Sequence, residues 1–448
     1  MGTASSNPVH PAMHFDMDKK MASVGVQDAK GVTTLIQRGP DGTVHTLGSV
    51  AVQPLLAPAP LHCPPLANRW SAANRADFTA KPSAYTFGQV VSALRKTLRA
   101  YVDFGQEEAT LVACWIVGTY FHPLFPAFPR LALNGERGSG KTRVLQLIAL
   151  TAFNGRLEIT PTQAVLYRSI DPLRCTFCID EAEHVMGIGD IIRSGYKRGG
   201  YVTRNEKQGD KYVPVSYRVD APMAFGSINE LDATDMDRSL RIVMEKSANK
   251  AIVNLEVQDT APIFTQLRDA LHRLALMSWE KVDEVRRSLD TPHPALIGRP
   301  WELFKPLFVI AKLAELPGCT DHLLALAEQR IGAEPTLPDE GRALFQEIQK
   351  RLALYDSVKV YPKLLMAGMH LDLTVPVSAK RVGALLRRYG FKAEKETARG
   401  IPYHLTRDDF LTRAKRWGFA ASGFSVPSTE HWDCDKGPSL DALPALKE

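Results

Sequence analysis

The strongest constraint on this 448-residue chain is an eight-residue run at positions 135–142, Gly-Glu-Arg-Gly-Ser-Gly-Lys-Thr. Its glycines keep side-chain bulk out of the loop, so that consecutive backbone N–H groups can wrap around a phosphate. A short apolar segment at 131–134 precedes the run, and a helical pattern over 142–153 follows it. This order predicts a buried strand, a phosphate-binding loop and a helix whose N-terminus faces the anion.

The residues of the run at 135–142 are predicted to have different roles in binding a nucleotide. Lys141 is expected to reach the β- and γ-phosphates, and Thr142 is expected to offer its hydroxyl to Mg²⁺. The positive end of the following helix would stabilise the same phosphates. The sequence therefore predicts ATP and Mg²⁺ as ligands. The predicted nucleotide-binding residues are Gly135, Glu136, Arg137, Gly138, Ser139, Gly140, Lys141, Thr142 and Arg143.

An acidic pair follows a later apolar segment, Cys-Thr-Phe-Cys-Ile at 175–179. We expect Asp180 to bind the magnesium ion together with Thr142, since the end of this strand should lie beside the loop. Glu181 is predicted to orient and deprotonate the attacking water. Adjacent carboxylates are also common on solvated turns, but their place at a strand end after the loop favours the catalytic interpretation.

Strands that alternate with helices from residue 129 onward predict an α/β fold, a parallel sheet with the nucleotide at its carboxyl edge. A further buried strand over 221–228 ends at Asn229, which would hold the attacking water from the far side of the γ-phosphate. Arg238 lies just before the last core strand, where it can reach the γ-phosphate of a neighbouring subunit. The alternatives are that Asn229 caps the next turn and that Arg238 pairs with a nearby aspartate. The predicted catalytic residues are Lys141, Asp180, Glu181, Asn229 and Arg238.

Composition and periodicity divide the rest of the chain into segments. Residues 1–30 are polar and aperiodic, and we expect them to be mobile, whereas 32–47 resemble a β-hairpin. Apolar residues recur at helical spacing from Phe87 to about Phe121, which predicts two helices. The predicted domains are an N-terminal tail, hairpin and linker (1–84, proline-rich over 53–66), a helical collar (85–128), the ATPase core (129–250), a helical lid (251–333), a linker (334–341), a C-terminal domain of helix, helix, helix, hairpin and helix (342–420) and a disordered tail (421–448).

Six cysteines are too few and too scattered for a secreted disulfide framework, which indicates a reducing, cytoplasmic location. Cys175 and Cys178 lie inside an apolar strand with no further ligand pair nearby, so we expect buried side chains rather than a zinc site. The apolar stretch 109–128 is interrupted by His122 and Pro123, which favours a buried helix over a membrane span.

These motifs together resemble the AAA+ ATPases, and more narrowly the replicative helicases of phages, plasmids and integrative elements related to superfamily III. The resemblance depends on the order of phosphate loop, Asp-Glu strand, polar-ended strand and the Asp-x-Asp-Arg motif at 235–238, and it covers about residues 85–418. It implies a homo-hexameric ring that acts on single-stranded and forked DNA, with a primase or other replication protein as a partner. Arg299, which opens a lid helix, would be a second sensor of the γ-phosphate unless it caps or pairs locally.

The resemblance directs attention to 200–218, which is typical of two strands around a Lys-Gln-Gly-Asp-Lys tip. In the related helicases, a hairpin at this position lines the central pore and grips the backbone of single-stranded DNA. The resemblance therefore implies phosphate contacts for Arg204, Lys207 and Lys211. An ordinary exposed hairpin with solubilising lysines is the alternative.

Positive charge is concentrated near the C-terminus: residues 341–420 carry sixteen Lys or Arg against seven Asp or Glu, whereas the whole chain has a net charge of +6. A helix from 378 onward would bury Val382, Leu385 and Leu386 and expose its basic side chains. The segment is similar to a C-terminal domain of mobile-element primase-helicase proteins, and a basic helix followed by a basic hairpin predicts a winged helix that binds DNA. Protein binding is the alternative. The predicted DNA contacts here are Lys380, Arg381, Arg387, Arg388, Lys392, Lys395 and Arg399.

Three functional hypotheses follow. The first is a ring-forming, ATP-dependent DNA helicase or translocase for replication of a phage or mobile element. The second is a replication initiator or helicase loader that uses ATP as an assembly switch on DNA. The third is a defence-associated ATPase that does not unwind DNA. A lysine-tipped pore hairpin favours the first, because a loader does not need one.

Overall fold

The computed structural model describes residues 9–27, 33–48, 69–185, 188–228, 233–294, 296–332, 339–369, 377–416, 419, 421 and 431–433. The chain divides into two compact units, Met1–Ile331 and Gly332–Glu448. The first contains the glycine loop, and the second contains the basic C-terminal segment. Each unit has hydrophobic clusters of its own.

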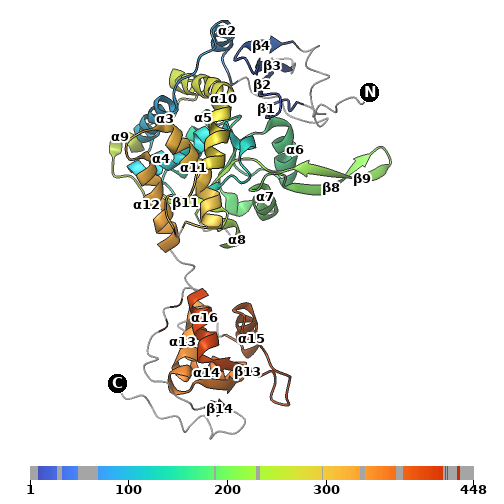
Figure 1. The fold of residues 1–448 in the computed structure, drawn as a ribbon, viewed down its shortest axis with the longest axis vertical. Coiled ribbons are helices and arrows are strands. Elements are labelled where there is room, and N and C mark those ends of the chain that lie inside the picture. Colours follow the sequence, from blue (N-terminus) through green and yellow to red (C-terminus); the bar gives the residue numbers. More distant parts are fainter. Residues whose placement is uncertain are drawn as a thin grey trace. The chain divides into compact units, whose positions relative to one another are not determined.

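A parallel sheet lies inside the first unit (Figure 1). Within the described residues it has five strands in the order β11-β5-β10-β7-β6, and every neighbouring pair is parallel. All carboxyl ends therefore meet at one edge, where such sheets bind their ligands. The prediction of an α/β fold with a parallel sheet is confirmed. The strands are β5 (Arg130–Asn134), β6 (Arg156–Glu158), β7 (Phe177–Ile179), β10 (Met223–Ser227) and β11 (Ser239–Val243).

Burial explains why such short segments become strands. β5, β7 and β10 are buried at every position, and their near-continuous apolar sequences suit a sheet that is covered on both faces. Cys175 and Cys178 are fully buried, as expected. The connecting helices are α5 (Lys141–Thr151), η3 (Ala182–His184), α6 (Gln163–Leu173), α7 (Ile188–Gly195) and α8 (Ala233–Met236).

Helices before and after the sheet share one core. The two predicted helices before it are confirmed as α3 (Phe87–Tyr101) and α4 (Gln106–Thr119), followed by η2 (His122–Leu124). α4 is buried at every position from 109 to 119, and no helix among the described residues is long and apolar enough to cross a membrane. After the sheet come α9 (Lys250–Val253), α10 (Pro262–Ser288), α11 (Arg299–Ala314) and α12 (Cys319–Gly332).

The predicted collar, ATPase core and lid segments belong to one compact unit. α10 packs on α3 and α5, and α11 packs on α3 and α4. Their apolar side chains merge into a single cluster that includes Leu94, Trp115, Leu271 and Phe308. The segment predicted as a lid is therefore helical, as expected, but its helices share their hydrophobic core with the collar.

The N-terminal region has more regular structure than its sequence indicated. The predicted hairpin over 32–47 is confirmed as β3 and β4, but the expectation that 1–30 is mobile is wrong for β1 and β2. The four strands form an antiparallel sheet that packs on α10. The linker predicted at 53–66 lies outside the described residues. The elements are β1 (Met13–Asp16), β2 (Met21–Gln27), β3 (Thr33–Arg38), β4 (Val44–Leu47) and α2 (Ala72–Ala80).

The first two strands form because apolar residues alternate with polar ones and the apolar side chains pack against α10. Ala22, Val24 and Val26 are buried on one face of β2. Phe15 of β1 stacks on Trp279 of α10, with ring centroids 5.8 Å apart. A charged turn separates the two strands, which makes the segment look polar as a whole.

The second unit combines helices with a small sheet. β12 (Ser357–Val360), which was not predicted, pairs antiparallel with β13 (Tyr403–Thr406) and parallel with β14 (His431–Asp433). The expectation of a disordered tail from 421 is therefore wrong for 431–433. These residues give partners to the backbone groups on one edge of β12. The helices are α13 (Asp339–Leu354), α14 (Pro362–Gly368), α15 (Ala379–Arg388) and α16 (Arg407–Arg416).

Candidate nucleotide-binding site

The glycine run forms a tight loop between β5 and α5 at the carboxyl edge of the sheet. Gly138 and Gly140 have φ angles of +79° and +90°, a left-handed conformation that glycine adopts without strain. α5 begins at Lys141, directly after Gly140 and without a side-chain cap. The N–H groups of its first turn are therefore available to an anion.

The start of α5 meets the acidic end of β7. Lys141 is buried, and its ammonium donates to the carbonyl oxygens of Gly135 and Glu136 at 2.6 and 2.9 Å. The Thr142 hydroxyl donates to Asp180 Oδ2 at 2.5 Å. The structure thus brings together a hydroxyl and a carboxylate, the oxygen ligands that suit Mg²⁺ beside a phosphate.

Two further carboxylates lie beside Asp180. Glu181 is exposed and has a left-handed φ of 52°, and its N–H donates to Asp180 Oδ1 at 3.1 Å. Glu183 was not predicted, although its place two residues after Glu181 in the same acidic run was a signal. Its Oε1 accepts the Ile228 N–H at 3.0 Å, and its Oε2 is buried without a hydrogen-bond partner among the described residues.

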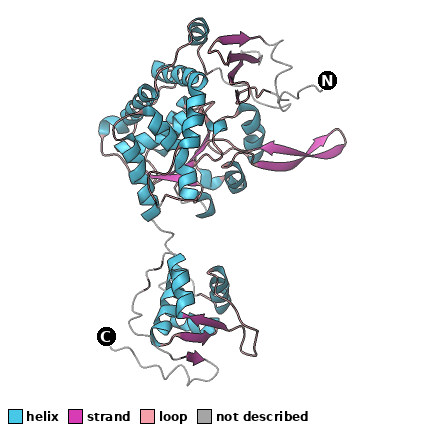
Figure 2. Cartoon of the chain, viewed as in Figure 1, coloured by secondary structure: helices cyan, strands magenta, loops and turns pink. Residues whose placement is uncertain are grey.

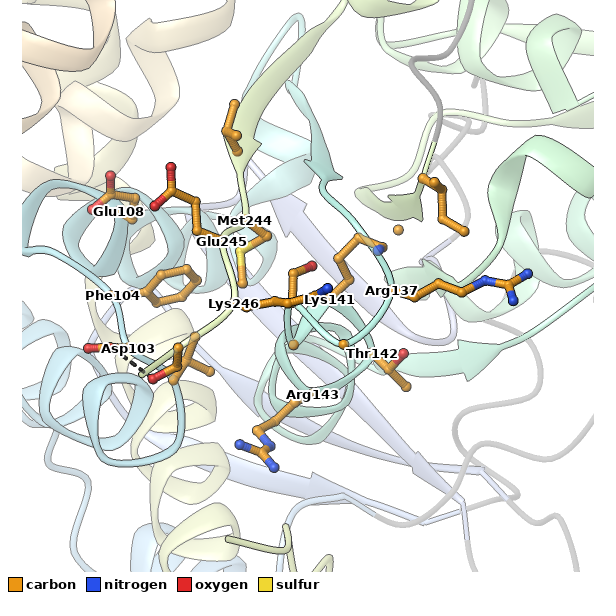
Figure 3. Close-up of a pocket in the computed structure, with 18 of the residues that line it drawn as sticks. Asp103, Phe104, Glu108, Arg137, Lys141, Thr142, Arg143, Met244, Glu245 and Lys246 are labelled. Carbon is orange, nitrogen blue, oxygen red and sulfur yellow. Dashed lines mark hydrogen bonds between the residues drawn. The ribbon is translucent and has the colours of Figure 1, made fainter. Parts of the chain in front are cut away.

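These residues line a cavity of about 810 Å³ (Figure 3), within the size range of small-molecule sites. The glycine loop and the start of α5 form one side. Residues 101–105 and Glu108, from the end of α3 to the start of α4, form another side, together with 243–247 at the end of β11 and just beyond it. The Ser247 hydroxyl donates to Asp103 at 2.7 Å and joins these last two segments. Local sequence motifs do not predict such wall residues, because these residues come from segments that are far apart in the sequence.

Arg143 connects three segments of the cavity wall by hydrogen bonds. Its guanidinium donates to the carbonyl oxygens of Ile252 at 2.6 Å and Val253 at 3.0 Å, and also to that of Tyr101 at 3.3 Å. In Figure 3 the side chain points away from Lys141. Arg143 thus joins α5 to α3 and α9, and its contact with a nucleotide stays a prediction.

The donor set and the packing fit a magnesium nucleotide. A Cβ atom at Gly135 would collide with the Met244 carbonyl oxygen, so only glycine allows the loop to lie this close to the end of β11. Ser139 Oγ is buried without a hydrogen-bond partner among the described residues, as is Glu183 Oε2. Buried polar atoms are normally satisfied: the Ser139 hydroxyl would donate to a phosphate oxygen, and Glu183 Oε2 would accept from an ordered water. Glu136 and Arg137 border the same loop; Glu136 pairs with Lys246 at 3.0 Å in an exposed contact.

Arg238 and Arg299 lie at the other edge of the sheet. The Arg238 carbonyl accepts the Arg130 N–H at 3.2 Å, where β5 begins, while the loop follows the opposite end of β5. At about 3.3 Å per residue, the length of β5 separates Arg238 from the glycine loop by about 15 Å. Neither arginine is among the described residues that line the cavity.

A buried tyrosine organises this arginine-bearing edge. The guanidinium carbons of Arg238 and Arg299 lie 5.4 and 5.8 Å from the centre of the Tyr196 ring. Arg299 also forms an ion pair with Asp237. Burial lowers the pKa of the nearby Arg330, although Asp237 opposes this effect. Asn229 lies outside the described residues, and its role stays a prediction.

β8 (Tyr201–Gln208) and β9 (Lys211–Arg218) form a hairpin that projects from the first unit (Figures 1 and 2). The predicted hairpin over 200–218 is confirmed. Side chains alternate along a strand, and directly paired residues share a face. Lys207 pairs with Tyr212, whereas Lys211 pairs with Gln208, so the two lysines lie on opposite faces. A nucleic-acid strand that lies on one face meets only one of them.

One face of the hairpin is anchored to α6. Glu206 accepts hydrogen bonds from Arg168 at 2.7 and 2.8 Å, and Arg204 donates to Gln163 at 3.1 Å. The rings of Tyr217 and Tyr167 lie 4.7 Å apart. Arg204 is thus half-buried at the base of the hairpin. The residues of this anchored face are Val202, Arg204, Glu206, Lys211, Val213, Val215 and Tyr217.

In the second unit, α15 has the predicted two-sided character. Val382, Leu385 and Leu386 are buried, as expected. The Arg381 guanidinium pairs with Glu340 at 2.8 Å. Bridges between Ala393 and Tyr403 and between Thr397 and Gly400 form the predicted hairpin after α15. The basic side chains exposed on α15 and this hairpin are Lys380, Arg381, Arg387, Arg388, Lys392, Lys395 and Arg399.

Comparison with known proteins finds solved structures that resemble this chain at low sequence identity. No family model and no curated protein matches the chain. Among solved structures, the apo A form of the NrS-1 C-terminal region is 12% identical with a TM-score of 0.35, and the match covers 86% of this chain and 96% of that one. SCCmec type IV Cch, described as an active helicase, is 10% identical with a TM-score of 0.36, covering 93% of this chain and 100% of that one. At these values the likeness establishes neither a shared fold nor a shared activity.

Gly226 of β10 lies against Asp180 and the first turns of α5, and it provides a first prediction. A Cβ atom there would lie 2.7 Å from Asp180 Oδ1 and 3.0 Å from Leu145 Cδ1. Gly226→Ala should therefore displace Asp180 and lower ATP turnover on the order of 100-fold, since small misplacements have effects of this size. Turnover and the melting temperature should be measured together. Gly383→Ala is the control, because its Cβ would make only an ordinary 3.6 Å contact with Pro362. Normal turnover in a folded Gly226→Ala protein would contradict the assignment of Asp180.

Proposed function

We propose that the chain is a ring-forming, ATP-dependent DNA helicase or translocase that serves the replication of a phage or mobile genetic element. The observation that carries the ATPase part is the Thr142–Asp180 hydrogen bond of 2.5 Å beside the glycine loop. Residues that are far apart in sequence meet there at the carboxyl edge of a parallel sheet, where such folds bind nucleotides. The motif resemblance to superfamily III helicases supports the choice of DNA as the substrate.

The residues of the site divide the work of hydrolysis. Lys141 and the loop N–H groups would bind the β- and γ-phosphates, and Thr142 with Asp180 would hold Mg²⁺. When bound, Mg²⁺ neutralises charge on the phosphates and orients them for in-line attack. Glu181, exposed beside Asp180, would accept a proton from the attacking water at its carboxylate. Asn229 is proposed to hold that water from the other side.

A neighbouring copy of the chain would complete the site. Arg238 cannot reach the loop of its own chain, because the length of β5 lies between them. Among the described residues, the cavity lining has six carboxylates, at 103, 108, 180, 181, 183 and 245, against four cationic side chains, at 137, 141, 143 and 246, whereas the opposite edge presents Arg238 and Arg299. Copies that join these two edges head to tail form a ring when the rotation between neighbours closes, and the ring is proposed here as a hexamer. Arg299 would then approach the neighbour's nucleotide together with Arg238.

DNA contact is proposed for both units. The projecting hairpin would reach a single strand in the ring with its tip, where Lys207 on one face and Lys211 on the other would contact phosphates on the two sides of the tip, while Arg204 acts at its base. In the second unit, α15 and the following hairpin would bind duplex or forked DNA as a winged helix. A primase or other replication protein is the proposed partner at the fork.

The winged-helix proposal predicts a change in the salt dependence of binding. Arg387→Ala combined with Arg388→Ala should weaken binding to forked DNA about tenfold and lower the slope of log affinity against log salt by about 2, because two phosphate contacts are lost. Fluorescence anisotropy over a salt series measures both quantities. Lys350→Ala removes an exposed charge from α13 and should change neither. An unchanged slope in the double variant would argue for protein binding by this surface instead.

Strand displacement on forked DNA tests the proposed function directly. The chain should separate the labelled strand with ATP and Mg²⁺, but not with a non-hydrolysable ATP analogue, and Lys141→Ala should be inactive. Substrates with either single overhang give the direction of movement. ATP turnover without displacement on any fork would contradict the helicase proposal and favour the initiator or loader hypothesis.

A further inference from the structure

We propose that Tyr212, near the tip of the β8–β9 hairpin, stacks on an unpaired nucleic-acid base while Lys207 beside it binds the adjoining phosphate. The proposal deepens the proposed function, on which it rests. It names the feature of a single strand that one face of the hairpin recognises, an exposed base together with its phosphate. Neither the glycine loop nor the charge pattern of the sequence points to this tyrosine.

The strand register defines a second face, opposite the anchored face, which we call the open face. Paired residues in an antiparallel ladder lie about 5 Å apart at their Cβ atoms, so Tyr212 and Lys207 are direct neighbours. The residues of the open face are exposed except Arg218 at the base of the hairpin, which is half-buried, in contrast to the buried or half-buried positions along most of the anchored face. The residues of the open face are Tyr201, Thr203, Asn205, Lys207, Tyr212, Pro214, Ser216 and Arg218.

The anchors on α6 fix the direction in which the open face points. Glu206 is held by Arg168, and Tyr217 packs on Tyr167, so the anchored face is turned toward the body of the unit. The open face is therefore directed away from α6. Tyr212 is 72% exposed, the largest exposed fraction among the exposed large hydrophobic side chains of the described residues.

Packing does not explain an aromatic ring at this position. Tyr217 and Val202 at the base of the hairpin are buried and join the neighbouring hydrophobic cluster, whereas Tyr212 is absent from every cluster of the described residues. Exposed aromatic rings beside lysines bind single strands, because every base offers a face for stacking and each phosphate offers a charge. Tyr212 provides the ring for stacking and Lys207 provides the charge for the phosphate, and the two residues are direct cross-strand neighbours.

The test compares two single strands that differ only in their bases. One is an oligothymidylate, and the other has the same number of phosphates with abasic sites throughout. The unchanged protein should bind the oligothymidylate more tightly, by about fivefold or more, because stacking adds to phosphate contact. Equal affinity for both strands would overturn the stacking proposal and leave the proposed function intact. Failure to bind either strand would instead contradict the proposed function.

Variants of the hairpin show which residue causes the preference for the oligothymidylate over the abasic strand. Tyr212→Ala should remove the preference by lowering affinity for the oligothymidylate alone, and Tyr212→Phe should retain it, since the ring is kept. Lys207→Ala should weaken binding of both strands by the same factor. Val213→Ala alters an exposed side chain next to Tyr212 on the anchored face and should leave both affinities unchanged. A preference for bases that survives in Tyr212→Ala would show that the ring is not the stacking group.

Discussion

Glu181→Gln should lower ATP turnover by a factor of about 100 or more while leaving ATP affinity near that of the unchanged protein. General-base catalysis contributes on the order of 10² to 10⁴ in rate, and an amide of the same shape cannot accept the proton of the attacking water. The Glu181 side chain is exposed, and only its backbone N–H bonds to Asp180, at 3.1 Å, so the substitution leaves the magnesium ligands in place. Turnover is measured by phosphate release, and affinity by fluorescent-nucleotide titration.

Two further variants sharpen this result. Lys141→Ala removes the ammonium that the loop surrounds and should abolish ATP binding itself, so the two variants separate chemistry from binding. Glu284→Gln changes an exposed carboxylate on α10, outside the nucleotide cavity, and should affect neither quantity. Ordinary turnover in Glu181→Gln would remove this residue from its proposed role and direct attention to Glu183, whose Oε2 is buried in the same cavity.

Arg238→Ala should reduce turnover about 1,000-fold and leave ATP binding nearly unchanged. An arginine supplied by a neighbouring subunit contributes on the order of 10³ to 10⁵ to phosphoryl transfer, because it meets charge that develops in the transition state. Arg238 lies at the edge of the sheet opposite the cavity, so its loss leaves the residues of its own site untouched. Arg287→Ala, which removes an exposed guanidinium from α10, is the matched control.

Mixing two inactive variants tests whether Arg238 acts on a neighbour. A Lys141→Ala subunit still carries Arg238, and an Arg238→Ala subunit still carries an intact loop. Mixed rings therefore contain junctions with a complete site, and turnover should return to a fraction set by the mixing ratio. A mixture that assembles into rings but stays inactive would show that Arg238 does not complete a neighbour's site.

The nucleotide motif could be predicted from sequence because its chemistry is local. The glycine loop, Lys141 and Thr142 are consecutive, and Asp180 directly follows an apolar strand. The contact between Asp180 and the start of α5 depends on the order of the strands, in which β10 lies between β5 and β7. Gly226 of β10 has no side chain and so leaves room for Asp180 to approach α5. The fold class followed from the same alternation of strands and helices.

Other parts of the site depend on contacts that no local pattern encodes. The cavity wall at 101–105 and the buried oxygen of Glu183 arise from packing between distant segments. The hairpin itself was predictable, but a shift of register by one residue changes the face of every side chain. The placement of Lys207 and Lys211 on opposite faces, and the anchoring of Arg204, therefore needed coordinates.

The most direct test of the central claim is the rate of ATP hydrolysis by the purified chain with and without single-stranded DNA. A motor that couples the cavity to the projecting hairpin should show magnesium-dependent turnover that rises several-fold when the strand is added. Turnover that is the same with and without the strand, or a protein that does not hydrolyse ATP at all, would contradict the account.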